Sequence, residues 1–277
     1  MNIRKMINSN IKKTTEIDVE NKKNNQLELA KIDTENLLKI FSILEEIVGE
    51  KKFKDSSIRG KLRGYMPLTK INGHLKMEKI EVPLVRLIAL LKTWTSEMNL
   101  LSGYNNKSNS GRKFSIDLAK KHKKVLKLAE VKEWEGSDAL IYAVIEIISN
   151  FFIYLIMRKK ESNIKNRWVP ECKKFQLEII APTKYYCNQN IHNYTEINKK
   201  INKSLSEAMQ QLKSRYSVDH IKFAFREVAI DNDKLGLKKI MEEVPGLLTN
   251  KYLDGKPTKK VRQQLANKFN LSIQNVK

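Results

Sequence analysis

An aspartate and a Glu-x-Lys triplet about a dozen residues later are the side chains of this chain best suited to chemistry. Asp117 lies in the alternating run FSIDLA, and Glu130 and Lys132 lie at the end of the run VLKLAEVK. Side chains two apart on a strand face the same side, about 6.5 to 7 Å apart. Carboxylates that hold Mg²⁺ (or Mn²⁺) against a phosphate, with a cation that orients the attacking water, hydrolyse phosphodiester bonds. On this hypothesis Asp117, Glu130 and the main-chain carbonyl of Val131 bind the metal, and Lys132 completes the catalytic set.

The triplet is a weak signal by itself, because Glu-x-Lys occurs four times in this lysine-rich chain, starting at Glu20, Glu50, Glu130 and Glu171. Only the copy at Glu130 ends an apolar, strand-like run and follows a second such run that carries an aspartate. The other interpretation is that Asp117 and Lys132 are edge charges of a solvated sheet, with Glu130 paired to a nearby lysine. The residues leave both interpretations open.

The elements that must position these residues can be predicted from hydrophobic periodicity. The order of helices and strands predicts an α/β fold with a mixed sheet flanked by helices. The predicted helices are 35–48, 83–98, 138–157 and 197–216, and the predicted strands are 114–119, 125–132, 175–180 and 220–228.

These residues resemble a known family. The stretches IDLA, VLKLAEVKEW, SDALIYAVIEI, LEIIAPTKYY and IKFAF are similar to the PD-(D/E)xK nuclease superfamily, and particularly to a group of uncharacterised bacterial proteins within it. The resemblance covers roughly residues 85–228. It implies a restriction-endonuclease-like fold, Mg²⁺ dependence and phosphodiester cleavage, with Asp117, Glu130 and Lys132 in the roles of the metal-binding acids and the lysine.

The chain departs from the superfamily pattern in two places. Ile116 stands where the motif has a proline before the aspartate. The acidic residue that many members carry on the first core helix has no unambiguous match, and Glu97 is a better candidate for it than Glu81. Glu146 lies in the helix pattern of the uncharacterised group, and its place among apolar residues fits either a supporting role near the site or a hydrogen bond on the helix face. Some members of the superfamily are inactive binding modules, so the fold alone does not establish activity.

The charge of the chain indicates a polyanionic partner. The formal net charge is +22, from 53 Lys and Arg against 31 Asp and Glu. The natural partner is a polyanion, either nucleic acid or an acidic membrane surface, and nucleic acid, in particular DNA, is the expected one. The alternative is that a lysine-rich proteome raises the lysine content of every chain. We expect residues 1–33 to form a flexible basic arm, 34–82 a helical N-terminal region, 83–230 the nuclease-like core and 231–277 a helical C-terminal region.

The C-terminal residues 258–277 have the rhythm of a helix-turn-helix, with Asn270 at the turn. The residues expected to contact nucleic acid there are Lys259, Lys260, Arg262, Ser272, Gln274, Asn275 and Lys277. Because the chain has only a few residues after the turn, the alternative is a plain helical hairpin.

The compartment and the assembly are predicted more weakly. Two cysteines without zinc spacing indicate a reducing cytoplasm. The apolar segment 138–157 has the length of a membrane span, but Glu146, Ser149 and Asn150 inside it favour a buried core helix and no membrane. One site per chain suggests a homodimer or a larger assembly. The alternative function is a catalytically inactive nucleic-acid-binding subunit of a replication, transposition or defence assembly.

Overall fold

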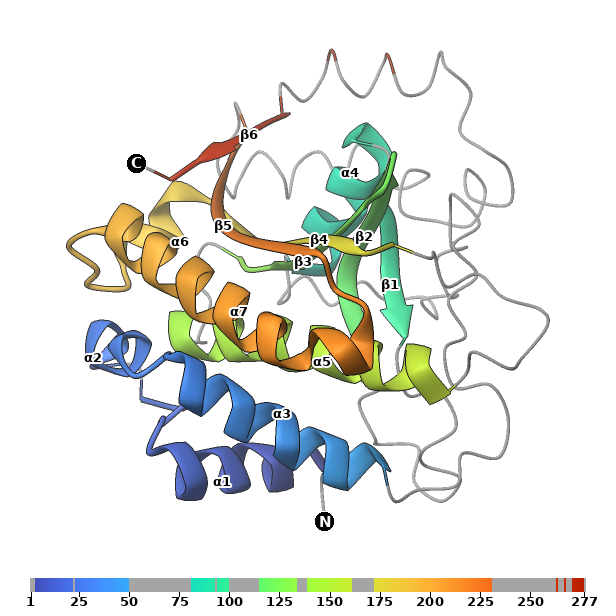
Figure 1. The fold of residues 1–277 in the computed structure, drawn as a ribbon. Coiled ribbons are helices and arrows are strands. Elements are labelled where there is room, and N and C mark those ends of the chain that lie inside the picture. The colour runs from blue at the N-terminus through green and yellow to red at the C-terminus, as the bar shows by residue number, and fades with distance from the viewer. Residues whose placement is uncertain are drawn as a thin grey trace.

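The protein is an α/β fold built on one mixed sheet of six strands (Figure 1). The computed structural model describes residues 3–21, 23–49, 81–92, 94–99, 115–133, 139–160, 172–230, 263, 267 and 271–276. The strands lie side by side in chain order. They are β1 (Thr95–Asn99), β2 (Ser115–His122), β3 (Val125–Val131), β4 (Lys174–Ala181), β5 (His220–Ile230) and β6 (Leu271–Asn275).

The sheet is antiparallel at its two sides and parallel in its middle. β1, β2 and β3 form an antiparallel meander, β3, β4 and β5 run parallel, and β6 returns antiparallel to β5. Parallel neighbours need crossover connections. Helix α5 (Leu140–Lys160) makes the crossover from β3 to β4, and α7 (Tyr194–Tyr216) follows the short α6 (Thr183–Cys187) from β4 to β5. Both crossover helices lie on one side of the sheet, and α4 (Glu81–Lys92) lies on the other (Figure 1).

Helix α5 is apolar over most of its surface because protein covers nearly all of it. It lies between the sheet and a layer of N-terminal helices (Figure 1). The helix is long and apolar enough to cross a membrane, yet 89% of its most apolar window is buried inside the protein. A helix that is hydrophobic all round and covered by its own chain has the character of a core helix.

The N-terminal residues belong to the core, so the prediction of a flexible arm over 1–33 is wrong. They form α1 (Ile3–Thr15) and α2 (Asn25–Ala30), which pack with α3 (Thr34–Gly49) beside α5. Their buried apolar side chains are Ile7, Ile11, Ile17, Val19, Leu29 and Ile32. These side chains are spaced among Lys, Asn and Thr, so the mean polarity of the segment hides a narrow apolar stripe.

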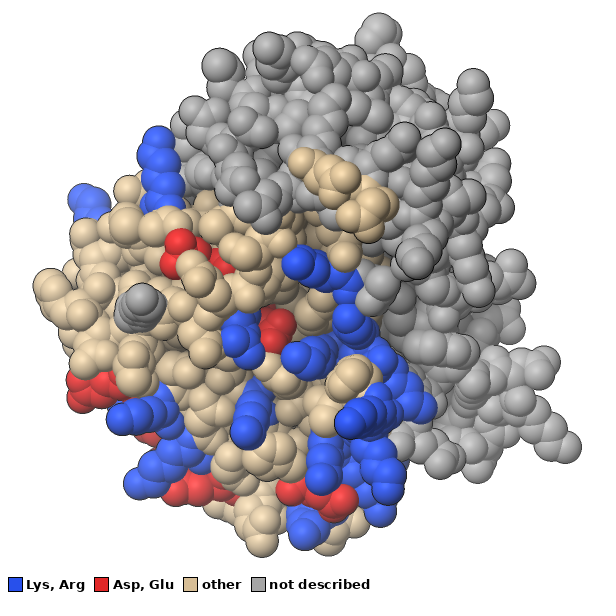
Figure 2. Space-filling model, turned by 90° about the horizontal axis from the view of Figure 1, so that it is seen from above, with Lys and Arg blue, Asp and Glu red and all other residues tan. Residues whose placement is uncertain are grey.

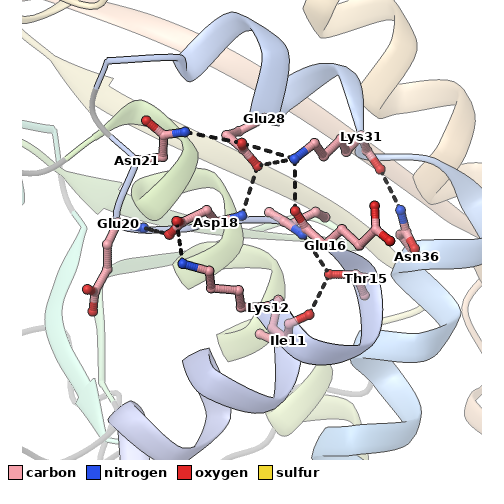
Figure 3. A network of polar contacts seen from close by, with 11 residues as sticks. Ile11, Lys12, Thr15, Glu16, Asp18, Glu20, Asn21, Glu28, Lys31 and Asn36 are labelled. Atoms are coloured by element: carbon pink, nitrogen blue, oxygen red, sulfur yellow. Dashed lines mark hydrogen bonds and ion pairs between the residues drawn. The ribbon is translucent and has the colours of Figure 1, made fainter.

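A polar network fixes the turn between α1 and α2 (Figure 3). The buried carboxylate of Glu28 accepts hydrogen bonds from the backbone N–H of Asp18 at 2.8 Å and from Nζ of Lys31 at 3.0 Å. Lys31 also donates to the carbonyl oxygen of Glu16, a residue with a positive φ of 59°. A buried charge is stable when it is paired and hydrogen-bonded in this way. The network therefore holds α1 in place against α5.

Two predicted elements differ from the structure. The helix predicted over 83–98 ends at Lys92, and its last residues form β1 instead. Pairing with β2 decides this, because Thr95 to Asn99 lie along Ala119 to Ser115. Of the helical N-terminal region expected over 34–82, residues 50–80 lie outside the described set.

The helix-turn-helix is the second difference. Gln263 and Asn267 are helical, as expected, but Leu271–Asn275 form an edge strand on β5. Leu271 is buried and Ile273 packs beside it against the cluster under α4. Two apolar residues two apart fit a strand as well as a short helix, and the open edge of β5 selects the strand. Neither the helix-turn-helix nor the alternative helical hairpin is formed.

Candidate active site

Asp117 and Glu130 face each other across two antiparallel strands. The register pairs Leu118 with Ala129 and Ala119 with Leu128, which places Asp117 opposite Glu130 one step further along. Residues opposite each other in an antiparallel pair share a face, with Cβ atoms about 5 Å apart. The regular backbone pairing of β2 and β3 stops at this point. There the side chain of Asp117, instead of its backbone, bonds to β3, because Oδ2 accepts a hydrogen bond from the N–H of Val131 at 2.9 Å.

Their surroundings raise the pKa of both carboxyl groups. Glu130 is 2% exposed, and burial, followed by the negative charges of Asp117 and Glu146, raises its pKa well above the ordinary 4.5. Burial also raises the pKa of Asp117, although the nearby charge of Lys132 opposes this shift. A side-chain hydrogen bond joins the carboxyl groups, which lowers the pKa of Asp117 and raises that of Glu130. Of the two groups, Glu130 has the more strongly raised pKa, so it is the one that favours its protonated form.

Helix α5 supplies partners for both Glu130 and Lys132 from one face. Nδ2 of Asn150 donates to Oε1 of Glu130 at 2.9 Å, and Oε2 of Glu146 accepts from Nζ of Lys132 at 2.9 Å. Tyr142 lies one turn before Glu146, and its ring centroid is 5.7 Å from Nζ of Lys132. Residues four apart on a helix are neighbours on its surface. The polar stripe on an otherwise apolar helix therefore faces the end of β3.

Arg4 on α1 completes the charge balance. A terminal nitrogen of its guanidinium lies 2.5 Å from Oε1 of Glu146, so each oxygen of this carboxylate holds one cation. Burial raises the pKa of Glu146, but the charges of Lys132 and Arg4 more than offset burial and leave the pKa lowered. Glu146 is therefore an ionised carboxylate between two positive groups.

Helix α1 closes this side of the site. The space left between α1 and α5, lined by Arg4, Tyr142, Glu146 and Asn150 among others, is a cavity of about 20 Å³. That volume is enough for about one water molecule. The cavity includes Ser149, whose buried hydroxyl has no hydrogen-bond partner. A phosphodiester cannot reach the carboxyl groups through this gap, so any such substrate must approach from another direction.

The donor set around Asp117 fits a divalent cation with few protein ligands. No group of three or more His, Cys, Asp and Glu side chains suited to a metal occurs within the parts of the chain that the structure describes. Mg²⁺ is commonly held by one or two carboxylates, with water and substrate phosphate supplying the remaining oxygens. Burial and mutual repulsion disfavour the charged forms of these two carboxyl groups, and a bound cation would offset that cost. Asp117 and Glu130 are thus the residues that would hold the metal.

The structure brings together four of the residues singled out from the sequence: Asp117, Glu130, Lys132 and Glu146. Val131 lies between them, with its N–H bound to Asp117. Glu97 lies in β1 rather than on a helix, between the residues that pair with Ile116 and Leu118, and its side chain is outside the described set.

The C-terminal residues expected to bind nucleic acid do not join this site. Lys259, Lys260, Arg262 and Lys277 lie outside the described residues. Ser272, Gln274 and Asn275 lie on β6, in a strand where recognition-helix positions were expected. Asn275 accepts a hydrogen bond from Arg226 of β5.

Two residues of the cluster were missed as site residues, Asn150 and Arg4. Asn150 had a visible signal, since it lies four residues after Glu146 in an apolar helix, at the spacing that puts both side chains on one face. Arg4 had none, because its contact with Glu146 spans 142 positions of the sequence and depends on how α1 packs.

Comparison with known proteins gives no relative for this arrangement: no family model, no curated protein and no solved structure matches the chain.

Proposed function

We propose that this protein is a metal-dependent nuclease that hydrolyses phosphodiester bonds, with DNA as its substrate. The observation that carries the proposal is the pair of carboxyl groups, the buried Glu130 and the half-buried Asp117, that face each other across β2 and β3 beside Lys132. Such a pair is costly to fold without a cation. The overall charge of +22 favours a polyanionic substrate over a small neutral one.

The proposed chemistry divides among three groups. Asp117 and Glu130 hold Mg²⁺ or Mn²⁺, which when bound supplies the positive charge that the developing phosphorane needs. Lys132 orients the attacking water and stabilises negative charge with its ammonium group. Glu146, shared between Lys132 and Arg4, pairs with the ammonium group and limits its movement.

The finer fold assignment is part of the same proposal. Residues 85–228, where the resemblance to PD-(D/E)xK nucleases lies, run from α4 through β5. A restriction-endonuclease-like core accounts for an acid on β2, a Glu-x-Lys triplet at the end of β3 and a helix that follows and supports both.

A second candidate function is a nucleic-acid-binding subunit without catalytic activity. The observation that favours it is the ion pair between Lys132 and Glu146, which occupies the ammonium group that a nuclease would direct at water. The absence, among the described residues, of any group of three His, Cys, Asp or Glu side chains suited to a metal points the same way.

Cleavage of supercoiled plasmid, single-stranded DNA and RNA with Mg²⁺ or Mn²⁺ tests the proposal. We expect Asp117→Asn, Glu130→Gln and Lys132→Ala each to lower the rate at least about 100-fold, the loss typical of removing one group that stabilises transition-state charge. The matched control is Glu20→Gln, which alters the exposed acid of another Glu-x-Lys triplet and leaves the rate unchanged.

Three results would count against the nuclease. Equal cleavage by Glu130→Gln and Glu20→Gln would assign the activity to a contaminant. Full cleavage in the presence of EDTA would remove the metal from the mechanism. Salt-sensitive binding without any cleavage by the wild type would establish the inactive binding subunit instead.

A further inference from the structure

The side of the sheet opposite α5 carries a row of basic residues at matched register. Lys120 pairs with Lys127 across β2 and β3, Lys127 pairs with Gln176 of β4, and Gln176 pairs with Lys222 of β5. Neighbouring strands are about 4.8 Å apart, so this row crosses four strands over about 14 Å. The alternation along each strand puts these side chains on the face that α4 partly covers, with Leu118, Ala129, Ile180 and Val228.

Two further cations extend the row on the same face. Arg226 lies four residues after Lys222 on β5, and Lys174 lies two residues before Gln176 on β4. The buried acid of this face is Glu178, whose carboxylate is 3.2 Å from Nε of Arg226 and 4.0 Å from Nζ of Lys127. We name Lys120, Lys127, Lys174, Lys222 and Arg226 the cationic face. Figure 2 looks onto this side and shows Lys and Arg side chains gathered around acidic ones.

The cationic face is electrostatically unfavourable by itself. Like charges placed directly opposite each other on neighbouring strands destabilise a sheet, and Lys120 and Lys127 are such a pair. Lys120 is held there by a hydrogen bond of 2.7 Å from Nζ to the carbonyl oxygen of Lys92, at the end of α4. Burial, then the charges of Lys127 and Lys92, lowers the pKa of Lys120. An anion bound over the row would relieve this repulsion.

The surroundings identify the kind of anion. Lys127 and Arg226 are half-buried, with side chains 30% and 22% exposed. A narrow polyanion can therefore reach them more easily than a flat bilayer can. The one exposed large apolar residue in the described parts of the chain is Leu27, which lies on α2, on the α5 side of the sheet. A membrane surface site usually adds inserted apolar or aromatic side chains, and stacking on bases needs aromatic ones.

We propose that the cationic face binds the phosphate backbone of nucleic acid without reading its sequence. Phosphate contacts hold and orient a nucleic acid but carry no sequence information directly. The face lies on the opposite side of the sheet from Glu130, so it is a second contact and not the floor of the candidate active site. The inference takes nucleic acid as the partner from the proposed function, but it does not require cleavage.

DNA binding measured in EDTA, where a metal-dependent nuclease cannot cleave, tests this surface. Labelled single-stranded and duplex DNA of mixed sequence are titrated over a series of salt concentrations. The variant Lys127→Gln/Lys222→Gln removes two charges from the face, and Lys199→Gln/Lys203→Gln removes two exposed charges from α7 as the matched control. Each lost phosphate contact lowers the slope of log affinity against log salt by about 0.9 on duplex DNA. We expect a decrease of about two in the first variant and none in the control.

A single substitution guards against misfolding of the double variant. Lys222 is exposed, so Lys222→Glu leaves the fold intact, which a thermal melt verifies, and should weaken binding more than Lys199→Glu does. Equal salt slopes for both double variants would overturn the proposal. So would a Lys127→Gln/Lys222→Gln variant that loses only binding to phosphatidylserine vesicles, because the face would then be a membrane surface.

The plasmid assay separates this inference from the proposed function. A wild type that never cleaves, but whose salt slope depends on Lys127 and Lys222, supports the cationic face and removes the nuclease. A wild type that cleaves, with equal slopes for both double variants, supports the nuclease and removes the cationic face.

Discussion

Glu146 on α5 holds Lys132 at the end of β3, with 2.9 Å between Oε2 and Nζ. The ion pair ties the core helix to the strand that carries Glu130, and Arg4 binds the other oxygen of the same carboxylate. The side chains of Lys132 and Glu146 are only 5% and 9% exposed. The position of the ammonium group is thus set by tertiary contacts from two helices.

Replacing Glu146 tests how strongly this ion pair is coupled. Glu146→Gln leaves the buried ammonium of Lys132 without its counter-charge, so we expect the free energy of unfolding to fall by about 3 kcal/mol. The double variant Glu146→Gln/Lys132→Met also removes the ammonium charge and should recover the part of the loss that does not come from the Arg4 contact. Urea unfolding of both variants measures the difference.

The control for this cycle is an exposed pair of the same type. Glu35 and Lys39 lie one helical turn apart on α3, and Glu35→Gln should leave the free energy of unfolding almost unchanged. A Glu146→Gln variant as stable as Glu35→Gln would show that the buried pair contributes nothing.

The raised pKa of Glu130 gives the metal-free protein a distinctive pH dependence. Because the folded pKa of Glu130 is raised, the folded state keeps a proton that the unfolded chain releases near pH 4.5. Stability is therefore highest below pH 4.5 as far as this group is concerned, and it is lost as pH rises from there to the folded pKa. Glu130→Gln should abolish this loss and be more stable than the wild type at neutral pH in EDTA.

Magnesium should reverse the order of stability of the wild type and the Glu130→Gln variant. At a concentration about 100 times the dissociation constant, a bound ion adds about 2.7 kcal/mol to the free energy of unfolding. We expect that increase in the wild type at neutral pH and none in Glu130→Gln, measured by urea unfolding with and without Mg²⁺. A wild type whose stability changes neither with pH in this range nor with Mg²⁺ would contradict the raised pKa of Glu130.

A separate prediction concerns the start of α5. The backbone N–H groups of Leu140 and Ile141, which have no partner within the helix, donate to Oε1 of Gln189 and Oδ1 of Asn25 at 2.9 and 3.1 Å. Nδ2 of Asn25 also donates to Gln189 at 3.0 Å. Asn25→Ala leaves buried groups unsatisfied and should lower the free energy of unfolding by about 1 to 3 kcal/mol.

The neighbouring asparagine provides the control for Asn25. Asn24 is exposed and its side chain makes no capping hydrogen bond, so Asn24→Ala should have little effect in the same thermal or urea unfolding experiment. Similar losses in the two variants would mean that the start of α5 does not depend on the Asn25 side chain.

The sequence by itself determined the elements whose hydrophobic period is unambiguous. The alternating runs around Asp117 and Glu130 predicted β2 and β3, because a strand with one buried face has an apolar residue at every second position. The continuous apolar run predicted α5, because a helix buried all round is apolar along its length. The same reasoning placed Asp117 and Glu130 on strands that pair. The α/β fold with a mixed sheet and flanking helices followed from the order of these elements.

Tertiary structure decided what short or mixed segments become. Leu271–Asn275 has too few apolar residues for a period to be read, and the open edge of β5 makes it a strand rather than a helix. Residues 3–32 are polar on average, and only packing against α5 shows that their isoleucines form part of the core. The pairing of Arg4 with Glu146, and the row of lysines across four strands, likewise join residues far apart in the chain. Such contacts depend on register and on helix packing, which local periodicity does not encode.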